Sequence, residues 1–284
     1  MDIAVQCSSS FGHDARNRSN RVPPYFRPLC VSQTQCLPVT FAGPTGPGIF
    51  LPAGEYSYIL AADVVNGDDD KEPRMKTLDW YFDFLSGFAY MQFKQLKELP
   101  SDVSVEFRPM LFAGVLEHHG TKGPAQIPRK RVFTYRQWIW QAQEAGIPFR
   151  MPPNHPFPPL PPLRLAIALK NDADAIETIF DHIWRGGEDI GDPESWVHLI
   201  NKLGVSDAEA LIGNESVKDQ LRQNTEKAIE LGLFGVPTTL IDDQLFWGQD
   251  STSMLFAYLK NPNIFKNSEM MRVENLPWGN IKWD

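Results

Sequence analysis

Strand-like alternation is confined to two separate stretches of this 284-residue chain, and segments with helical periodicity lie between them. In the first stretch, Leu78–Phe84 and Val103–Leu111 have the composition and alternation of strands. Between them, Ala89–Leu99 places apolar residues at helical spacing and ends at Pro100. A helix between two strands predicts a parallel pair with a right-handed crossover. This stretch is therefore expected to be a βαβ unit.

The second stretch lies near the C-terminus. Alternation returns in Pro237–Asp242 and Gln244–Trp247, and the acidic pair Asp242-Asp243 predicts a tight turn between them. Asp250–Leu259 has the pattern of a closing helix. These residues predict a β-hairpin followed by a helix, a ββα unit.

The middle of the chain is predicted to be helical apart from one connector. Residues 148–162 contain eight prolines, which predict an extended segment without helix or central strand. Helices are expected at Thr134–Ala145, Leu163–Arg185, Pro193–Leu203 and Asp207–Leu231, the last with Ser206 as its N-cap. The predicted fold class is α/β, with a helical domain (113–232) inserted between a βαβ half (75–112) and a ββα half (233–260).

Both ends of the chain differ from this patterned region. Residues 1–74 are rich in Ser, Asn, Pro and Gly, and only Tyr56–Val65 has a strand-like composition. We expect residues 1–74 to form a loosely ordered extension. Strong patterning begins after Met75, so one hypothesis is that Met75 is the true start; a native peptide from upstream would refute it. Residues 261–284 form a tail without clear periodicity.

Composition excludes several classes of protein. The net charge of -8 and the pI near 5.3 argue against nucleic-acid binding. Apolar runs are too short for a membrane span, and the first residues lack the apolar core of a secretory signal. We therefore expect a cytoplasmic protein without membrane contact. His118 and His119 lack metal-ligand spacing, so no metal site is expected.

The cysteines limit the chemistry further. Cys7, Cys30 and Cys36 are the only three, and all lie upstream of the patterned region. That region therefore has no Cys-x-x-Cys redox pair and no cysteine zinc site. Any thiol chemistry performed there needs a sulfur atom from another molecule.

Two positions in the predicted fold favour ligand binding. Ser86 lies where the crossover helix begins, at a helix end whose free N–H groups attract anions, although position alone favours a helix N-cap. Pro237 begins the third strand. A cis Val236–Pro237 bond would free the N–H and C=O of Val236 to pair with a peptide-like ligand, although a trans bond is commoner.

Several motifs in this order resemble the thioredoxin-like superfamily. Within it they resemble the branch of kappa-class glutathione transferases and 2-hydroxychromene-2-carboxylate isomerases. The motifs are Asp83–Tyr90 (DFLSGFAY), Gly120–Ala125 (GTKGPA), Ala145–Pro148 (AGIP), Leu233–Thr238 (LFGVPT) and Phe246–Asp250 (FWGQD). The resemblance covers roughly residues 75–260 and implies a DsbA-like thioredoxin fold with an inserted helical domain.

The resemblance also implies glutathione as cofactor, which agrees with the position of the cysteines. Ser86 would donate a hydrogen bond to the glutathione thiolate. Val236, beside a cis Pro237, would pair through its backbone with the cysteinyl part of glutathione. No histidine base is evident beside Ser86.

Further site residues follow from the same resemblance. Gln249 and Asp250 would meet the γ-glutamyl end, and Trp247 would form a wall of the site. Thr121 replaces an asparagine that contacts ligand in many family members. Without the family, Asp250 would be interpreted as a helix N-cap and Trp247 as an ordinary hairpin aromatic.

The chain departs from the family pattern in places that affect the substrate. Gly87 replaces a proline, which loosens the helix start after Ser86, and Ser251 replaces an arginine after Asp250. A basic cluster is either solvated surface or a site for a carboxylate of the substrate or of glutathione. Its members are Lys122, Arg129, Lys130, Arg131 and Arg136.

These features predict a glutathione-dependent cis–trans isomerase of an aromatic-ring-derived 2-oxo acid, in aromatic-compound catabolism. Its partner would be a small-molecule carboxylate substrate. A kappa-like glutathione transferase and a non-catalytic thioredoxin-fold binding protein without Cys-x-x-Cys remain alternatives. Relatives commonly dimerise, which implies a homodimer.

Overall fold

A computed structural model of the protein describes residues 75–277 and residue 279. The predictions for residues 1–74 lie outside the described residues: the loosely ordered extension, the Tyr56–Val65 strand and the three cysteines. The hypothesis that the protein starts at Met75 concerns the same residues.

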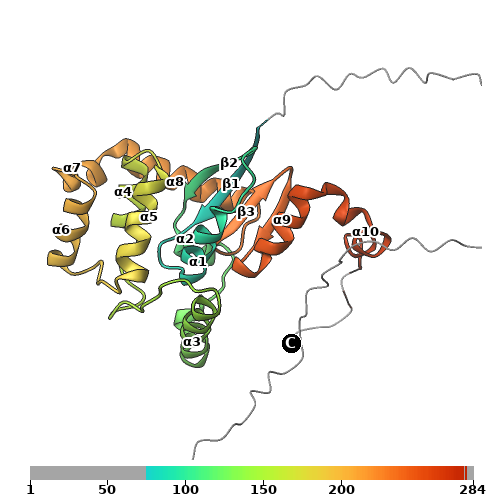
Figure 1. The fold of residues 1–284 in the computed structure, drawn as a ribbon, viewed down its shortest axis with the longest axis horizontal. Helices are drawn as coiled ribbons and strands as arrows, with labels where there is room; N and C mark the ends of the chain where they lie inside the picture. The colour runs from blue at the N-terminus through green and yellow to red at the C-terminus, as the bar shows by residue number, and fades with distance from the viewer. Residues whose placement is uncertain (1–74, 278, 280–284) are drawn as a thin grey trace, which may run out of the picture. The chain divides into compact units, whose positions relative to one another are not determined.

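A four-stranded sheet forms the centre of the described fold (Figure 1). Its spatial order is β2-β1-β3-β4, with β1 and β2 parallel and the other neighbours antiparallel. The strands are β1 (Lys76–Phe82), β2 (Val103–Pro109), β3 (Thr238–Ile241) and β4 (Gln244–Trp247). Asp242 and Asp243 form the turn of the hairpin with φ of 50° and 62°, the left-handed conformation that a two-residue hairpin turn requires. The predicted βαβ unit and hairpin are confirmed.

Helices α2 to α8 come between β2 and β3 in the chain, so the predicted helical insertion is also confirmed. In Figure 1, α4 to α7 gather on one side of the sheet and α9 on the other. The helices are α1 (Gly87–Leu96), α2 (Phe112–His118), α3 (Pro128–Glu144), α4 (Leu160–Ala168), α5 (Ala173–Phe180), α6 (Pro193–Lys202), α7 (Ala208–Gly213), α8 (Glu215–Glu230), α9 (Thr252–Lys260) and α10 (Ser268–Val273).

The single helix predicted over Leu163–Arg185 is wrong. Lys170 and Asn171 adopt positive φ and separate α4 from α5, and a π-helical turn, Asp181–Arg185, follows α5. The proline-rich connector is also shorter than predicted, because α4 starts at Leu160 with two prolines in its first turn. Proline is tolerated there since the first-turn N–H groups have no partner within the helix.

The single helix predicted over Asp207–Leu231 is wrong as well. Asn214 interrupts it and caps α8 by accepting a hydrogen bond from the N–H of Ser216. The N-cap of α7 is Asp207, not Ser206. Near the C-terminus, Ser268–Val273 forms α10 in a tail that showed no periodicity.

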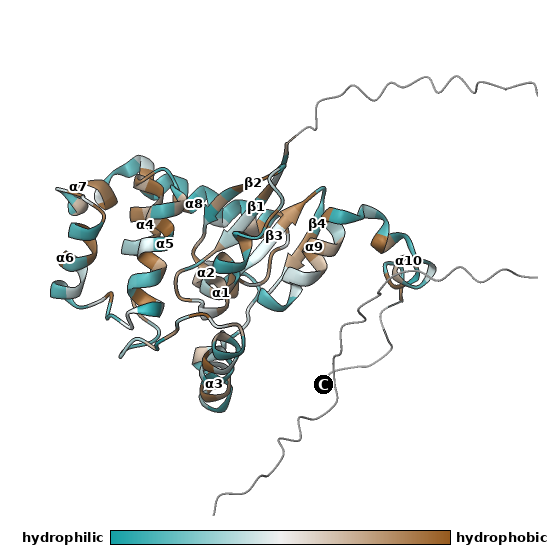
Figure 2. Cartoon of the chain, viewed as in Figure 1, coloured by the Kyte–Doolittle hydropathy of each residue, from teal (hydrophilic) through white to brown (hydrophobic). Residues whose placement is uncertain are grey.

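Aromatic side chains join the sheet to the inserted helices. Trp80 and Phe82 of β1 stack with ring centroids 4.6 Å apart, and Phe180 of α5 lies 4.6 Å from Phe84. Hydrophobic residues colour parts of β3 and α4 brown in Figure 2. The sheet and the inserted helices therefore share a core. Burial of these rings stabilises the packing of the insertion against the sheet.

Candidate active site

Ser86 is the N-cap of α1 and also lines a cavity. Its backbone is extended, with φ of -96° and ψ of 113°, and its Oγ accepts a hydrogen bond of 3.2 Å from the N–H of Ala89. Because a serine oxygen can accept while its own proton is donated elsewhere, the Ser86 proton remains available to a second partner. The predicted N-cap is confirmed, and it is compatible with donation to a ligand.

The carboxyl group of Asp83 holds the loop before Ser86. Asp83 is fully buried; its Oδ1 accepts from the N–H of Leu85 and its Oδ2 from the N–H of Phe112, both at 3.0 Å. Burial raises the pKa of Asp83 to about 7, and the two backbone hydrogen bonds oppose that rise. Since Phe112 is the first residue of α2, one carboxyl group fixes both the Ser86 loop and the start of α2.

Two ring N–H groups from the helical insertion hold the same loop. Trp184 donates from Nε1 to the carbonyl of Phe84, and Nε2 of His155 lies 2.9 Å from the carbonyl of Leu85. His155 bonds Leu85 and Tyr135 and not Ser86, so the expectation that no histidine base stands beside Ser86 stays a prediction. His155 belongs to the proline-rich connector, 70 residues from Leu85, and no local pattern in the sequence indicated that contact.

The Val236–Pro237 peptide bond is cis, as the resemblance implied. Among the described residues, no backbone hydrogen bond joins the N–H or C=O of Val236 to another main-chain group. The carbonyl of Pro237 accepts from the N–H of Gly248 at 2.9 Å, which fixes the strand entry against the loop after β4. The polar backbone of Val236 is therefore available to a ligand.

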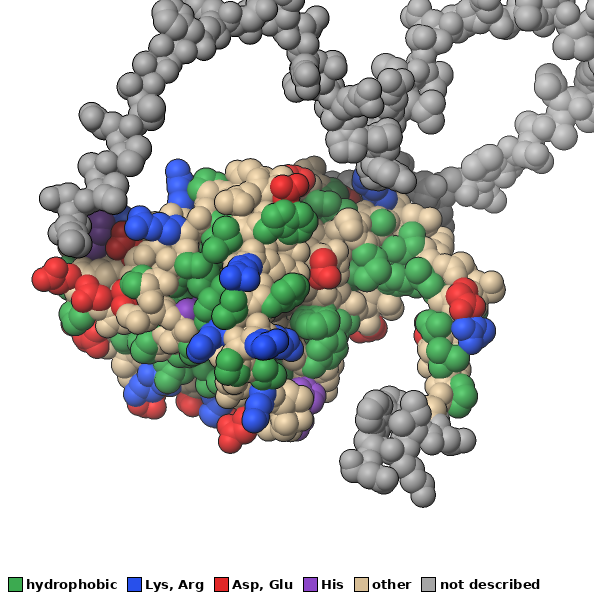
Figure 3. Space-filling model, turned by 90° about the horizontal axis from the view of Figure 1, so that it is seen from below, with side chains coloured by type: hydrophobic (Ala, Val, Ile, Leu, Met, Phe, Trp, Pro, Cys, Tyr) green, Lys and Arg blue, Asp and Glu red, His purple; other side chains and the backbone are tan. Residues whose placement is uncertain are grey.

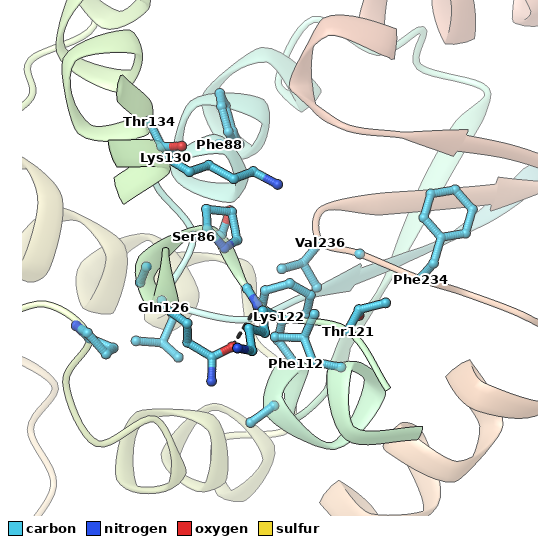
Figure 4. A pocket seen from close by; sticks show the side chains of 18 of the residues that line it. Ser86, Phe88, Phe112, Thr121, Lys122, Gln126, Lys130, Thr134, Phe234 and Val236 are labelled. Atoms are coloured by element: carbon cyan, nitrogen blue, oxygen red, sulfur yellow. Dashed lines mark hydrogen bonds between the residues drawn. The ribbon is translucent and has the colours of Figure 1, made fainter. Parts of the chain in front are cut away.

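A cavity of about 840 Å³ brings four of the predicted site residues together, and Ser86, Thr121 and Val236 are labelled in Figure 4. Its lining includes Ser86, Thr121, Val236 and Trp247. The two chain segments that carry the family motifs therefore meet at one hollow. Its volume is within the range of small-molecule sites.

Gln249 and Asp250 do not line this cavity, and neither does Pro237. Gln249 lies in the 3-10 turn before α9, where its Nε2 donates to Oε1 of Gln95 at 3.2 Å. Asp250 is exposed in the same turn, and the N-cap of α9 is Ser251 rather than Asp250. Contact of Gln249 and Asp250 with a γ-glutamyl group stays a prediction.

The buried side chain of Gln92 joins α1 to the loop after β4. Its Nε2 donates to the carbonyl of Gly248 and to Oγ1 of Thr252, both at 3.1 Å. Its Oε1 accepts from Nε1 of Trp80 at 2.7 Å. The helix that starts at Ser86 and the loop that carries Gln249 and Asp250 are thus fixed to each other.

Aromatic rings form two sides of the cavity. Phe88 of α1 packs edge-on against Trp138 of α3, with centroids 5.6 Å apart. On the other side, Phe234 and Trp247 are in edge-on contact at 4.9 Å and are 46% and 52% exposed. Such walls favour a flat, ring-containing ligand.

The basic cluster divides into two groups. All five side chains are exposed, but only Lys122 and Lys130 line the cavity, and both are labelled in Figure 4. Arg129, Arg131 and Arg136 lie outside its lining. Figure 3 shows Lys and Arg side chains interspersed with hydrophobic ones on the face seen from below. Two ammonium groups in one cavity favour an anionic ligand.

Another polar residue of the lining was not predicted. His119 follows α2, and its Nε2 lies 2.9 Å from the carbonyl of Leu233. Within residues 75–277, no group of three or more His, Cys, Asp and Glu side chains surrounds a common metal position. In the same part of the chain, every helix falls short of the length and apolar character needed to cross a bilayer.

Comparisons with known proteins identify relatives of this chain. The chain is 27% identical over 212 residues to glutathione S-transferase kappa 2 of Caenorhabditis elegans, covering 67% of this chain and 94% of that protein. It is 31% identical over 192 residues to 2-hydroxychromene-2-carboxylate isomerase of Pseudomonas putida, covering 63% of this chain and 91% of that protein.

A solved structure of a 2-hydroxychromene-2-carboxylate isomerase matches 68% of this chain and 98% of its own, with a TM-score of 0.57 at 25% identity. It confirms the predicted thioredoxin-like fold, and the relatives named above are enzymes. The model of the DSBA-like thioredoxin domain matches residues 77–260, although Ser86 and its neighbours here include no cysteine. The chain therefore belongs to the family of DSBA-like thioredoxin domains.

Proposed function

We propose that this protein is a glutathione-dependent cis–trans isomerase of an aromatic-ring-derived 2-oxo acid. The observation that carries the proposal is the meeting of three features in one cavity. They are the free proton of Ser86 at a helix N-terminus, the unpaired backbone of Val236, and the ammonium groups of Lys122 and Lys130. Each matches a different part of glutathione or of a carboxylate substrate.

Ser86 and the first turn of α1 favour an anionic sulfur atom. An ordinary thiol has a pKa of about 8.5, and lowering it by about 2 units takes roughly 2.7 kcal/mol of preferential stabilisation. A hydrogen bond to a charged group contributes about 1.5–3 kcal/mol and a helix N-terminus about 0.3–1 kcal/mol. The two together are sufficient, so Ser86 acts as a donor and not as a nucleophile.

The other parts of glutathione are assigned by their chemistry. The N–H and C=O of Val236 pair with the cysteinyl peptide unit. The carboxylate of Asp250 forms an ion pair with the γ-glutamyl ammonium group. Thr121 contacts the ligand from the cavity wall. Lys122 and Lys130 bind carboxylates, either the glycyl group of glutathione or the acid of the second substrate.

When bound, glutathione would supply a thiolate nucleophile for reversible addition to a conjugated double bond, the chemistry that allows such a bond to isomerise. The protein's part is to stabilise the sulfur anion, to hold the acid and to orient the flat substrate against Phe88 and Trp247. A kappa-like transferase would use the same groups but would retain sulfur in its product. The names of the relatives support both outcomes.

The test uses purified protein with 2-hydroxychromene-2-carboxylate as the probe substrate and a substoichiometric amount of glutathione. We expect many turnovers per glutathione molecule, and Ser86→Ala should abolish most of the turnover. Ser206→Ala, at an exposed serine away from the cavity, is the matched control. Consumption of one glutathione per turnover would instead establish a transferase.

Calorimetry tests the non-catalytic alternative. Absence of glutathione binding at millimolar concentration would refute the proposal and favour a binding protein that has no redox pair. The cytoplasmic location, the aromatic-catabolism role and the homodimer expected from the sequence stay predictions.

A further inference from the structure

Tyr135 and His155 form a hydrogen-bonded pair in the wall of the cavity. Tyr135 lies on α3 and His155 in the proline-rich connector, and both line the cavity together with Ser86. The phenol oxygen is 2.7 Å from Nδ1 of His155 and 3.1 Å from its carbonyl oxygen. The imidazole ring of His155 stands edge-on to the rings of Tyr135 and Trp138, and these contacts fix its orientation.

The surroundings determine where the protons of this pair lie. The carbonyl of Leu85 can only accept, so Nε2 of His155 must carry a proton and donate it. In the neutral ring, Nδ1 is then an acceptor, and the Tyr135 proton points towards it. Both acceptors near that proton belong to His155, and within residues 75–277 no protein group donates to the phenol oxygen. A lone pair of that oxygen is therefore available to accept from a ligand.

Burial keeps both members of the pair neutral. It raises the pKa of Tyr135 and lowers the pKa of His155, and the hydrogen bond to Leu85 opposes the latter shift. The positive charge of Arg131 opposes the rise of the Tyr135 pKa but is smaller than the effect of burial. At neutral pH the pair is thus a phenol that donates to a neutral imidazole.

We propose that Tyr135 accepts a hydrogen bond from a hydroxyl group of the second substrate and, together with His155, takes up its proton. The group that Tyr135 would recognise is a hydroxyl group on a ligand whose acid is bound by Lys122 and Lys130. This inference rests on the proposed function only in taking the cavity as the site of the second substrate.

The proton transfer is balanced within the pair. The substrate O–H bond breaks and its oxygen retains the electron pair, while the proton binds the oxygen of Tyr135. The former Tyr135 proton moves to Nδ1 of His155. The resulting imidazolium donates through Nε2 to Leu85 and through Nδ1 to Tyr135, and the reverse steps return the proton.

Ligand pairs that differ only in the hydroxyl group test the inference. The three hydroxybenzoates and their methoxy counterparts are titrated by calorimetry, with and without glutathione. We expect the best hydroxybenzoate to bind about tenfold more tightly than its methoxy counterpart, the effect of about one hydrogen bond. Tyr135→Phe should remove this preference. Tyr258→Phe should retain it, because Tyr258 lies on α9 and outside the cavity lining, and its hydroxyl donates to Asp242 of the hairpin turn.

Nitrogen NMR of the His155 ring gives a second readout that does not depend on turnover. We expect the neutral Nε2–H tautomer, with an Nδ1 signal that shifts when a hydroxybenzoate is added. An Nδ1–H tautomer, equal affinity for both ligands of every pair, no binding of any benzoate, or a preference that survives Tyr135→Phe would each overturn the inference.

The same titrations separate this inference from the proposed function. If the hydroxyl preference is absent while glutathione binds, only the role of the pair fails. If glutathione does not bind while the preference is present, the proposed function fails and the role of the pair stands.

Discussion

A Cβ atom built on Gly87 would lie 2.7 Å from Cδ2 of Trp138. The indole of Trp138 therefore fills the space that a larger residue after Ser86 would need. This contact explains why glycine stands where the family pattern has proline.

Replacement of Gly87 by alanine is expected to destabilise the protein by about 1–3 kcal/mol, because a packed core cannot absorb the added methyl group. Urea unfolding measures the change. Gly213→Ala is the matched control, since a Cβ on Gly213 meets no atom within 4 Å. In a double-mutant cycle with Trp138→Leu, most of the cost of Gly87→Ala should disappear; additive effects would contradict the contact.

The two roles of Ser86 can be separated by Ser86→Asp. A carboxylate is as good an N-cap acceptor as a hydroxyl, so we expect the free energy of unfolding to stay within about 1 kcal/mol of wild type. The same carboxylate has no proton to donate and repels a thiolate. Glutathione binding and the ultraviolet absorbance of its thiolate should therefore be lost, and retention of both would contradict the donor role.

Asp83 makes the stability of the protein depend on pH. Because its pKa is raised to about 7 in the folded state, the folded protein holds this proton more tightly than the unfolded chain does. Its contribution to stability is complete below about pH 4 and is lost as the pH rises towards 7, at up to about 1.4 kcal/mol per pH unit.

Urea unfolding across that window, on wild type and Asp83→Asn, isolates this contribution. His182 has a pKa lowered to about 4, mainly by burial, and it makes stability rise with pH over part of the same window. Its effect is common to both proteins and cancels in the difference. An unchanged slope in Asp83→Asn would show that Asp83 does not titrate there.

Lys130 is expected to bind a carboxylate in the cavity. Lys130→Gln should weaken the binding of glutathione or of the acidic substrate by about tenfold or more and should reduce its salt dependence. Lys260→Gln, at the exposed end of α9, should leave both unchanged. Calorimetry at two salt concentrations measures both quantities, and equal affinities for the two variants would exclude the contact.

The parts of the fold that follow local rules were predictable from the sequence. The bounds of β4 are the predicted Gln244–Trp247, because an acidic two-residue turn fixes the hairpin register. The break at Lys170-Asn171 was missed because it carries neither the glycine nor the proline that usually ends a helix. The break at Asn214 was missed although Gly213 precedes it, because a single glycine is tolerated within a helical pattern.

The site was predictable only where family motifs carry it. Ser86 and Val236 lie in such motifs, and the structure brings both to one cavity. The Tyr135–His155 pair was not found, because its contact depends on how the proline-rich connector folds back onto α3. That path is set by the packing of aromatic rings and not by any local periodicity.

The ring N–H groups of Trp184 and His155 that hold the carbonyls before Ser86 have a consequence for protein engineering. The segment between β2 and β3 therefore cannot be exchanged between related enzymes as an independent unit to alter their selectivity. A chimera has to bring its own indole and imidazole donors to those two carbonyls, or the loop that carries the serine hydroxyl of the recipient will lose two of its contacts.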